Sequence, residues 1–341
     1  MDEADVLRRA RGALLGVAIG DAMGAPVEGR TAAEIRAQYG VLTGFISDAA
    51  VGTDDTDFTL FNAYLLTTYG AAITPADVEA EWRDKLLAPG RAYRPGGFSD
   101  VVSTRNLAAG LHTPESGAFN HQMWSDGVAM AISPAGIIAA GKPETAARLA
   151  ETLGSISNGR DGLYAAQSVA AAIAVGMVGG TPDAIFAAAL DAAPPDSWTG
   201  RALRRAAATV ATLPNDLDGA LAELSDALVV PWWPWADLVT EAAPLAFGVF
   251  LATRGAARWA IPAGVSLGRD ADTIGAIVGS LCGVYGGDDA LPAEWIDRAR
   301  VSAGKCIGFV AGSEIADVAA RLVARIERWG KPLNHQEEMG I

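Results

Sequence analysis

The stretch GLYAAQSVAAAIAVGM at residues 162–177 decides the fold class. Its Ala and Gly residues cover nearly every face of a helix with 3.6 residues per turn, so no broad polar face remains for water. A helix of this kind is buried among other helices and packs closely against them through its small side chains. The sequence therefore predicts an all-α fold in which helices surround this segment.

The same helical pattern extends outward from this segment in both directions, with apolar residues at three- and four-residue spacing. Some of these helices begin with Thr followed by Pro, as at Thr74-Pro75 and Thr181-Pro182, which is typical of a first helical turn. Paired alternating runs around Asn-Gly or Asp-Gly, the signal of a β-hairpin, are absent. We expect helices over residues 5–18, 56–69, 75–87, 126–141, 144–156, 162–177, 182–192, 200–212, 216–229, 237–253, 271–285 and 313–328.

Composition and charge exclude several classes of protein. The 341 residues include 26 Lys and Arg against 40 Asp and Glu, and a net charge of −14 disfavours electrostatic binding to nucleic acid or anionic membranes. Two cysteines, Cys282 and Cys306, cannot form a disulfide framework or a cysteine-based zinc site. The charged start MDEADVLRR lacks the apolar run of a signal peptide. We therefore expect a soluble, cytoplasmic protein without a nucleic-acid or membrane partner.

No low-complexity linker divides the chain. The stretches 89–99 and 110–125 are expected to be long loops, which in a compact fold are commonly functional. We expect a single domain over residues 1–341, with the helix 313–328 packed on it and a polar tail at 330–341.

Acidic residues gather beside Gly and Thr at the edges of three predicted helices: GDAMGAPVEG at 20–29, GTDDTD at 52–57 and GRDADTIG at 268–275. An Asp or Thr at such a place commonly caps a helix. So many like charges near apolar helices are unfavourable, however, unless cations neutralise them. Oxygen ligands without nearby Cys favour Mg²⁺, Mn²⁺ or Ca²⁺ over zinc or copper. Helix capping and metal binding both remain open on the residues alone.

A set of longer motifs points to a known family. They are RARGALLGVAIGDAMGAPVE at 9–28, TDDT at 53–56, GVAM at 127–130, PETAARLA at 143–150, GRDADTIGAIVG at 268–279 and GVYG at 283–286. In this order, over about residues 9–290, the sequence resembles the ADP-ribosylglycohydrolase family, of the dinitrogenase-reductase-activating glycohydrolase and ADP-ribosyl-acceptor hydrolase type. The resemblance implies a compact orthogonal helical bundle around two Mg²⁺ or Mn²⁺ ions and a reaction that cleaves an ADP-ribosyl bond.

The resemblance also implies roles for individual residues. Asp272 would bridge the two ions, and Asp54, Asp55 or Glu28 would accept a proton from the attacking water. A metal pair suits this chemistry because it can orient water at an anomeric carbon. The implied metal ligands are Thr53, Asp54 and Asp55 on one side and Asp270, Asp272 and Thr273 on the other.

The sequence departs from the family pattern where substrate would bind. Ser125-Asp126-Gly127 stands where members often have Ser-Asn-Gly, Ala131 replaces an Arg, and Arg269 replaces the second Gly before Asp-x-Asp-Thr. Arg269 is expected either to pair with an acidic residue or to bind phosphate. The residues expected to contact substrate are Asp126, Gly127, Met130, His121 and Trp124.

Some of these residues have an ordinary structural interpretation as well. Asp126 fits equally as the N-cap of the helix 126–141, and His121 as a hydrogen-bonded loop residue. The run PWWPW at 231–235 fits either an anchored loop or oligomer contact, or a surface that stacks on a flat base.

The intact metal motifs favour a dinuclear-metal-dependent glycohydrolase that cleaves an ADP-ribosyl, or other ribosyl N- or O-glycosidic, bond by water attack. The altered substrate motifs favour, as an alternative, a hydrolase of a small N- or C-riboside. A non-catalytic ADP-ribose-binding protein is the third hypothesis. We expect a monomer or a small homo-oligomer.

Overall fold

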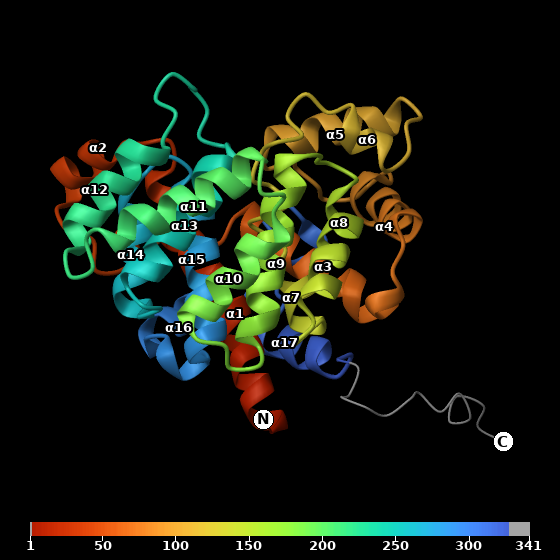
Figure 1. Ribbon diagram of the computed structural model, residues 1–341. Coiled ribbons are helices and arrows are strands. Elements are labelled where there is room, and N and C mark those ends of the chain that lie inside the picture. Colours follow the sequence, from red (N-terminus) through yellow and green to blue (C-terminus); the bar gives the residue numbers. More distant parts are fainter. Residues whose placement is uncertain (1, 327–341) are drawn as a thin grey trace.

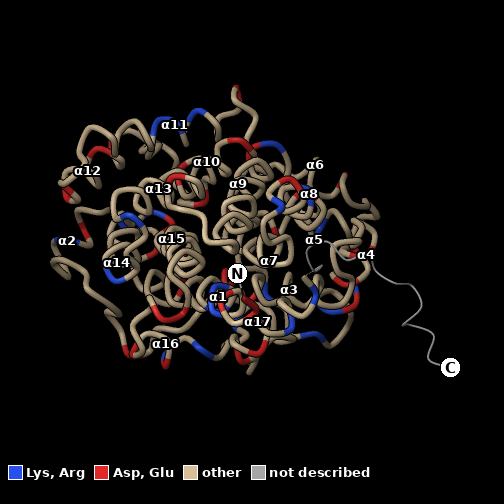
Figure 2. The backbone as a smooth tube through the Cα atoms, turned by 60° about the horizontal axis from the view of Figure 1, so that its bottom comes forward, with Lys and Arg blue, Asp and Glu red and all other residues tan. Residues whose placement is uncertain are grey.

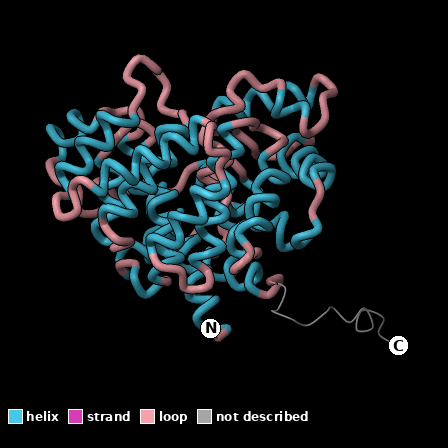
Figure 3. The backbone as a smooth tube through the Cα atoms, viewed as in Figure 1, coloured by secondary structure: helices cyan, strands magenta, loops and turns pink. Residues whose placement is uncertain are grey.

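The computed structural model describes residues 2–326, and helices joined by turns and loops make up this part of the chain (Figures 1 and 3). The described residues form no β-strand, only isolated bridges such as that between Thr31 and Gly268. The predicted all-α class is confirmed. The polar tail at 330–341 and the last two residues of the expected helix 313–328 lie outside the described residues. The single-domain organisation stays a prediction.

Most of the predicted helices are present, with shifted ends. They are α1 Glu3–Gly24, α3 Asp54–Tyr69, α4 Pro75–Glu81, α8 Pro143–Gly154, α9 Asp161–Gly176, α10 Pro182–Ala192, α11 Trp198–Ala211, α12 Leu217–Leu228, α13 Val239–Ala252, α15 Ala271–Gly286 and α17 Ile315–Val323. The expected helix 75–87 changes at Trp82–Leu87 into a π-helical turn. Short 3₁₀ turns cover Ala25–Val27, Gly70–Ala72, Asp288–Ala290 and Gly308–Val310.

The segment at 162–177 has the surroundings that its composition predicts. It forms α9, which packs against α8, α10, α13 and α15 and against the short α7 Ser133–Ile138. Ala170 and Ile173 are fully buried. An added Cβ on Gly136 of α7 would lie 2.5 Å from Cβ of Ile173, so these two helices touch almost at their backbones.

A very close helix contact joins two segments that are far apart in the sequence. α1 packs along α15, and Gly12, Gly16 and Gly20 share one face of α1 because they are four residues apart. A Cβ on Gly16 would lie 2.0 Å from the carbonyl oxygen of Gly279, and one on Gly20 would lie 2.0 Å from that of Gly275. We call this contact the glycine seam. It brings the end of α1 beside the start of α15, which are two of the three places where acidic motifs occur.

The predicted helix 126–141 is wrong. Residues 126–132 form turns, and only Ser133–Ile138 is helical. Pro134 lies in the first turn of α7, where its missing N–H is tolerated, whereas in a helix running from residue 126 it would remove a hydrogen bond to residue 130. The backbone N–H of Asp126 instead donates to the carbonyl of Asp237, 3.2 Å away. Asp126 is therefore not the N-cap of such a helix.

Other helices were not expected from the apolar pattern: α2 Ala32–Tyr39, α5 Phe98–Ala108, α6 Glu115–Ala118, α14 Ala257–Ser266 and α16 Ala293–Ala299. Two of them change the expected loops, since α5 begins inside 89–99 and α6 lies within 110–125. α2 buries only Ile35, and α14 contains Pro262, so neither shows a clear helical stripe in the sequence. α2 begins instead with a capping box, in which the Thr31 and Glu34 side chains bond to each other's backbone N–H.

Within residues 2–326, no helix is both long and apolar enough to cross a membrane. Figure 2 shows basic positions scattered among acidic ones around the periphery of the bundle.

Candidate active site

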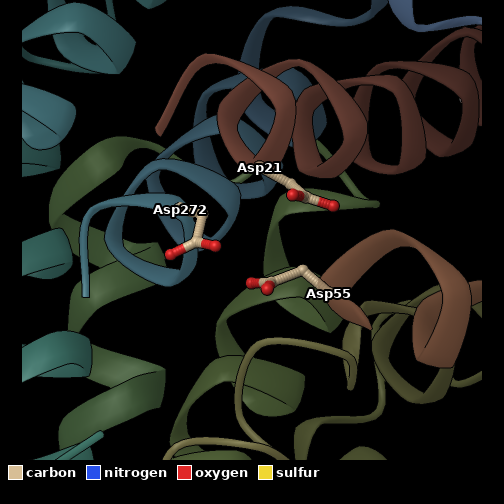
Figure 4. A group of neighbouring side chains, drawn as sticks. All are labelled: Asp21, Asp55 and Asp272. Carbon is tan, nitrogen blue, oxygen red and sulfur yellow. The ribbon is translucent and has the colours of Figure 1, made fainter. Parts of the chain in front are cut away.

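Three buried carboxylates from three helices converge where the glycine seam ends (Figure 4). Asp21 comes from the last turn of α1, Asp55 from the first turn of α3 and Asp272 from the first turn of α15. One oxygen from each lies within 4.8 Å of the others. These distances are short enough for a single cation to contact more than one of the three carboxylates.

Asp21 organises the start of α3. Its carboxylate accepts hydrogen bonds from the backbone N–H groups of Thr53 (2.7 Å) and Thr56 (3.0 Å). The hydroxyls of the same two residues donate to it at 2.8 and 2.5 Å. Thr53, the N-cap residue of α3, makes no side-chain capping bond of its own. Asp21 therefore caps α3 from a neighbouring helix and holds the Thr53-Asp54-Asp55 turn in place.

Asp55 and Asp272 are linked through Thr273. The Thr273 hydroxyl donates to Oδ1 of Asp55 at 3.1 Å, and the Thr273 backbone N–H donates to Oδ1 of Asp272 at 3.2 Å. The two acidic motifs, more than two hundred residues apart in the sequence, thus meet directly. The structure brings together the two groups of residues that the sequence proposes as metal ligands.

Within residues 2–326, no basic side chain balances these carboxylates. Burial raises the pKa of both Asp55 and Asp272 well above the usual range, and neighbouring Asp carboxylates raise it further. Burial, then Asp21 among others, raises the pKa of Asp54 to about 6. At the pocket rim, partial desolvation, followed by Asp270 and Asp54, raises the pKa of Glu28 to about 7. A divalent cation would favour the charged forms, and the donors are the hard oxygens that Mg²⁺ and Mn²⁺ prefer.

The carboxylates open into a pocket of about 390 Å³. Its walls come from the starts of α3, α5 and α15, the 125–130 turns and the loop before α13. The lining residues are Glu28, Gly29, Asp54, Asp55, Gly96, Gly97, Phe98, Ser99, Asp100, Val101, Ser125, Asp126, Gly127, Met130, Pro234, Trp235, Ala236, Asp237, Asp270, Asp272 and Thr273.

Comparison with known proteins identifies the chain. The profile of the family described as ADP-ribosylglycohydrolase matches residues 2–332. The chain belongs to the ADP-ribosylglycohydrolase family. It is 27% identical over 296 residues to an uncharacterized protein of Archaeoglobus fulgidus, which covers 84% of this chain and 90% of that protein.

The fold is also that of a solved structure. A chain titled "ADP-ribosylglycohydrolase-related protein complex" superposes with a TM-score of 0.64 and 23% sequence identity, covering 95% of this chain and all of the other. This likeness shows the fold. Membership of the ADP-ribosylglycohydrolase family indicates a glycosylhydrolase for ADP-ribosyl-type substrates. The family is typically metal-dependent, which agrees with the buried carboxylates of Asp21, Asp55 and Asp272.

The structure places most, but not all, of the residues proposed from the sequence of this ADP-ribosylglycohydrolase in the pocket. Of the expected substrate-binding residues, Asp126, Gly127 and Met130 line it. His121 is exposed, and neither it nor Trp124 lines the pocket. The Trp124 indole donates to the carbonyl of His121, and its ring lies 5.2 Å from that of Trp233.

The proposed metal ligands are placed more uniformly. Asp54, Asp55, Asp270, Asp272 and Thr273 line the pocket. Thr53 does not, and its hydroxyl points to Asp21.

Arg269 holds the tryptophan-containing loop. Its guanidinium pairs with Glu241 of α13, with Nε 2.9 Å from Oε2, and donates to the carbonyls of Trp233 and Trp235 at 3.2 Å. Its backbone has a φ of 60°, a left-handed conformation that is unfavourable for a residue with a Cβ. Of the two expected roles of Arg269, pairing with an acidic residue is the one observed.

The aromatic run at 231–235 divides between two environments. Trp232 is 82% exposed, whereas Trp235 lines the pocket and its ring lies 5.8 Å from that of Phe98 in an edge-to-face arrangement. Trp233 packs against both Trp124 and Trp235. Trp235 therefore reaches the pocket, whereas Trp233 anchors the loop.

Sequence reasoning about this family member missed some residues of the pocket wall. Asp100 and Asp237 line the pocket, yet each is a single Asp in a segment without a recognisable spacing. The clustering of Asp21 beside Gly20 was visible in the sequence, but its role in capping α3 depends on how α1 meets α3.

Proposed function

We propose that this ADP-ribosylglycohydrolase family member hydrolyses a ribosyl glycosidic bond with two divalent ions, Mg²⁺ or Mn²⁺. The observation that carries the proposal is the meeting of Asp55 and Asp272 through Thr273 beside a pocket. The ions would be held by Thr53, Asp54 and Asp55 on one side and by Asp270, Asp272 and Thr273 on the other, with Asp272 between them. When bound, such ions neutralise the carboxylates and lower the pKa of water.

The protein side chains divide the remaining work. Asp21 keeps the Thr53-Asp54-Asp55 turn in position from α1. Water attacks the anomeric carbon and gives up a proton, and the bond from that carbon to the leaving group breaks. We assign proton acceptance to Glu28, because Asp55 is buried and accepts a hydrogen bond from Thr273. Glu28 lines the pocket and is not one of the proposed metal ligands, so its carboxylate stays free to accept that proton.

ADP-ribosyl conjugates are the first substrates to consider, since the family suggests them. A small N- or C-riboside is the second candidate, and a feature of the pocket favours it. The described lining contains eight Asp and Glu residues and no Lys, Arg or His, so no side chain there can pair with a diphosphate. The guanidinium of Arg269 is already occupied by Glu241.

The test removes the metal and then the residue proposed to bridge it. Protein treated with a chelator is reloaded with Mn²⁺ and assayed for release of ADP-ribose from ADP-ribosylated peptides and of ribose from ribosides. We expect turnover only in the reloaded protein. Asp272→Ala should lower kcat/KM by at least about 10³-fold and abolish Mn²⁺ binding measured by calorimetry.

Asp183→Ala is the matched control, because Asp183 is an exposed carboxylate that pairs with Arg254 on the surface. This variant should keep both turnover and Mn²⁺ binding. Full activity of the chelated protein, or of the Asp272→Ala variant, would show that the assignment of the metal site is wrong.

A further inference from the structure

Asp126 and Asp237 form a second acidic group on the pocket wall. Both line the pocket, and the antiparallel bridge between Ser125 and Leu238 holds their backbones together. The N–H of Asp126 donates to the carbonyl of Asp237 at 3.2 Å. Two segments that are far apart in the sequence thus present two carboxylates to one space.

Each of these carboxylates has a buried oxygen with no hydrogen-bond partner, Oδ2 in both cases. Asp126 is 4% exposed, so water does not broadly solvate it. The carboxyl group of Asp126 also contacts the carboxyl group of Asp270. Oδ1 of Asp237 accepts a hydrogen bond from the Trp233 indole N–H at 3.2 Å. Buried polar atoms are nearly always paired in folded proteins, so two unpaired acceptors on residues of the pocket wall call for a donor, which a ligand in the pocket can supply.

Asp100 shows that unpaired carboxylate oxygens are not a general feature of the pocket wall. It is buried in the same wall, but its carboxylate accepts from the backbone N–H of Gly97 at 3.4 Å at the start of α5. Asp100 thereby caps its own helix, whereas Oδ2 of Asp126 and Oδ2 of Asp237 accept no hydrogen bond from any described residue.

The surroundings also restrict the charge of the ligand. The described lining holds no basic side chain, and the guanidinium of Arg269 is held by Glu241 and two loop carbonyls. A phosphate or carboxylate at this wall would face Asp126 and Asp237 without a basic side chain to pair with. A volume of about 390 Å³ is near the small end for ligand pockets, which favours a compact group.

We propose that Asp126 and Asp237 recognise N–H donors on the group attached to the ribose, so that the pocket selects amide- or amine-bearing ribosides over anionic ones. The inference rests on the proposed function in one respect, that the ribose lies at the neighbouring Asp55 and Asp272. Because Asp126 contacts Asp270, a group bound at this wall is next to anything held at those carboxylates.

Two probes that differ at a single group test the proposal: nicotinamide riboside and nicotinic acid riboside. In both, water replaces the pyridine ring at the anomeric carbon, so ribose, the free base and a proton are released. The first carries a carboxamide that donates two N–H bonds, and the second carries a carboxylate. We expect the Mn²⁺-loaded protein to prefer the amide by at least about 10-fold in kcat/KM.

Substitutions locate the source of that preference. Asp126→Asn and Asp237→Asn keep the shape of the side chain but remove the charge, and each should lower the amide preference at least about 3-fold. Asp100→Asn is the matched control and should leave the ratio of the two kcat/KM values unchanged. Thermal melts confirm that each variant is folded. A ratio that is the same in wild type, Asp126→Asn and Asp237→Asn would overturn the proposal.

Binding separates this proposal from the proposed function. Calorimetric titration of both ribosides into Mn²⁺-loaded protein does not require turnover. Preferential binding of nicotinamide riboside without hydrolysis would uphold the acidic recognition site and reject the proposed reaction. Hydrolysis of both ribosides at equal efficiency would uphold the reaction and reject the recognition site. Absence of binding by either riboside would also reject the recognition site.

Discussion

The contact between α1 and α15 is favourable along most of its length and unfavourable at one end. Along the glycine seam, Gly16 and Gly279 bring two backbones together without any side chain between them. At the end of the seam, Asp21, which directly follows Gly20, and Asp272 place carboxylates close together in a buried space. The seam is favourable in itself, whereas the carboxylates repel one another. The rigid contact therefore holds together an arrangement that its own charges oppose.

The largest expected effect comes from breaking the seam. A Cβ on Gly279 would lie 2.0 Å from the carbonyl oxygen of Gly16, and this backbone atom cannot move without separating the helices. Gly279→Val should lower the free energy of unfolding by at least about 4 kcal/mol, measured by urea denaturation.

Gly97→Ala serves as the control for this change, because a Cβ on Gly97 would meet no atom within 4 Å. Its free energy of unfolding should stay close to that of wild type. If Gly279→Val were as stable as Gly97→Ala, the two helices would not pack as closely as described.

An intermediate effect is expected where the seam and the pocket meet, at Asp21. Asp21→Ala removes the acceptor for two backbone N–H groups at the start of α3, so Asp54 and Asp55 lose their fixed position. We expect the affinity for Mn²⁺, measured by calorimetry, to fall about 10- to 100-fold. Asp21→Asn keeps an acceptor oxygen and should lose less. Unchanged affinity in Asp21→Ala would mean that the turn is held by other contacts.

The smallest effect concerns the burial of the carboxylates and, after it, the repulsion among them. The folded protein raises the pKa of Glu28 from 4.5 to about 7 and that of Asp100 from 3.8 to about 7. Between the usual and the raised values, the folded protein binds more protons than the unfolded chain, so its stability falls as the pH rises. The melting temperature of chelated protein should therefore decrease by a few degrees from pH 5 to pH 7.5.

Addition of Mn²⁺ should reverse this trend, because the ion binds the deprotonated carboxylates. The measurement is a set of thermal melts with and without the ion. A melting temperature of the chelated protein that rises over this pH range would contradict the described electrostatics.

Much of the fold could be predicted because its helices carry local signals. The small residues of 162–177 predict a buried helix, and α9 is one. The helix predicted over 126–141 was wrong, although the apolar spacing of this range suits a helix. Pro134 disfavours a longer helix here, and the backbone N–H of Asp126 bonds to Asp237 instead. The glycine seam was not predicted either, since spacing on α1 says nothing about which helix lies opposite.

The candidate site could be predicted in part for the same reason. Asp54, Asp55 and Asp272 occur in compact motifs at helix starts, and the structure brings them together. Asp237 could not be found, because it enters the pocket only through the bridge between Ser125 and Leu238. His121 and Trp124 were chosen for being next to Asp126, yet adjacent residues on a turn point in different directions.

The two helices of the glycine seam are also synthesised at very different times. α1 is complete at Gly24, whereas α15 begins at Ala271, close to the other end of the chain. At roughly 5–20 residues per second, a ribosome needs about 12–50 s to make the intervening segment. During this interval the backbone face of α1 has no partner, and Asp21 and Asp272 cannot yet meet. The seam face of α1 therefore stays uncovered through this interval, and the carboxylates of Asp21, Asp55 and Asp272 come together only after it.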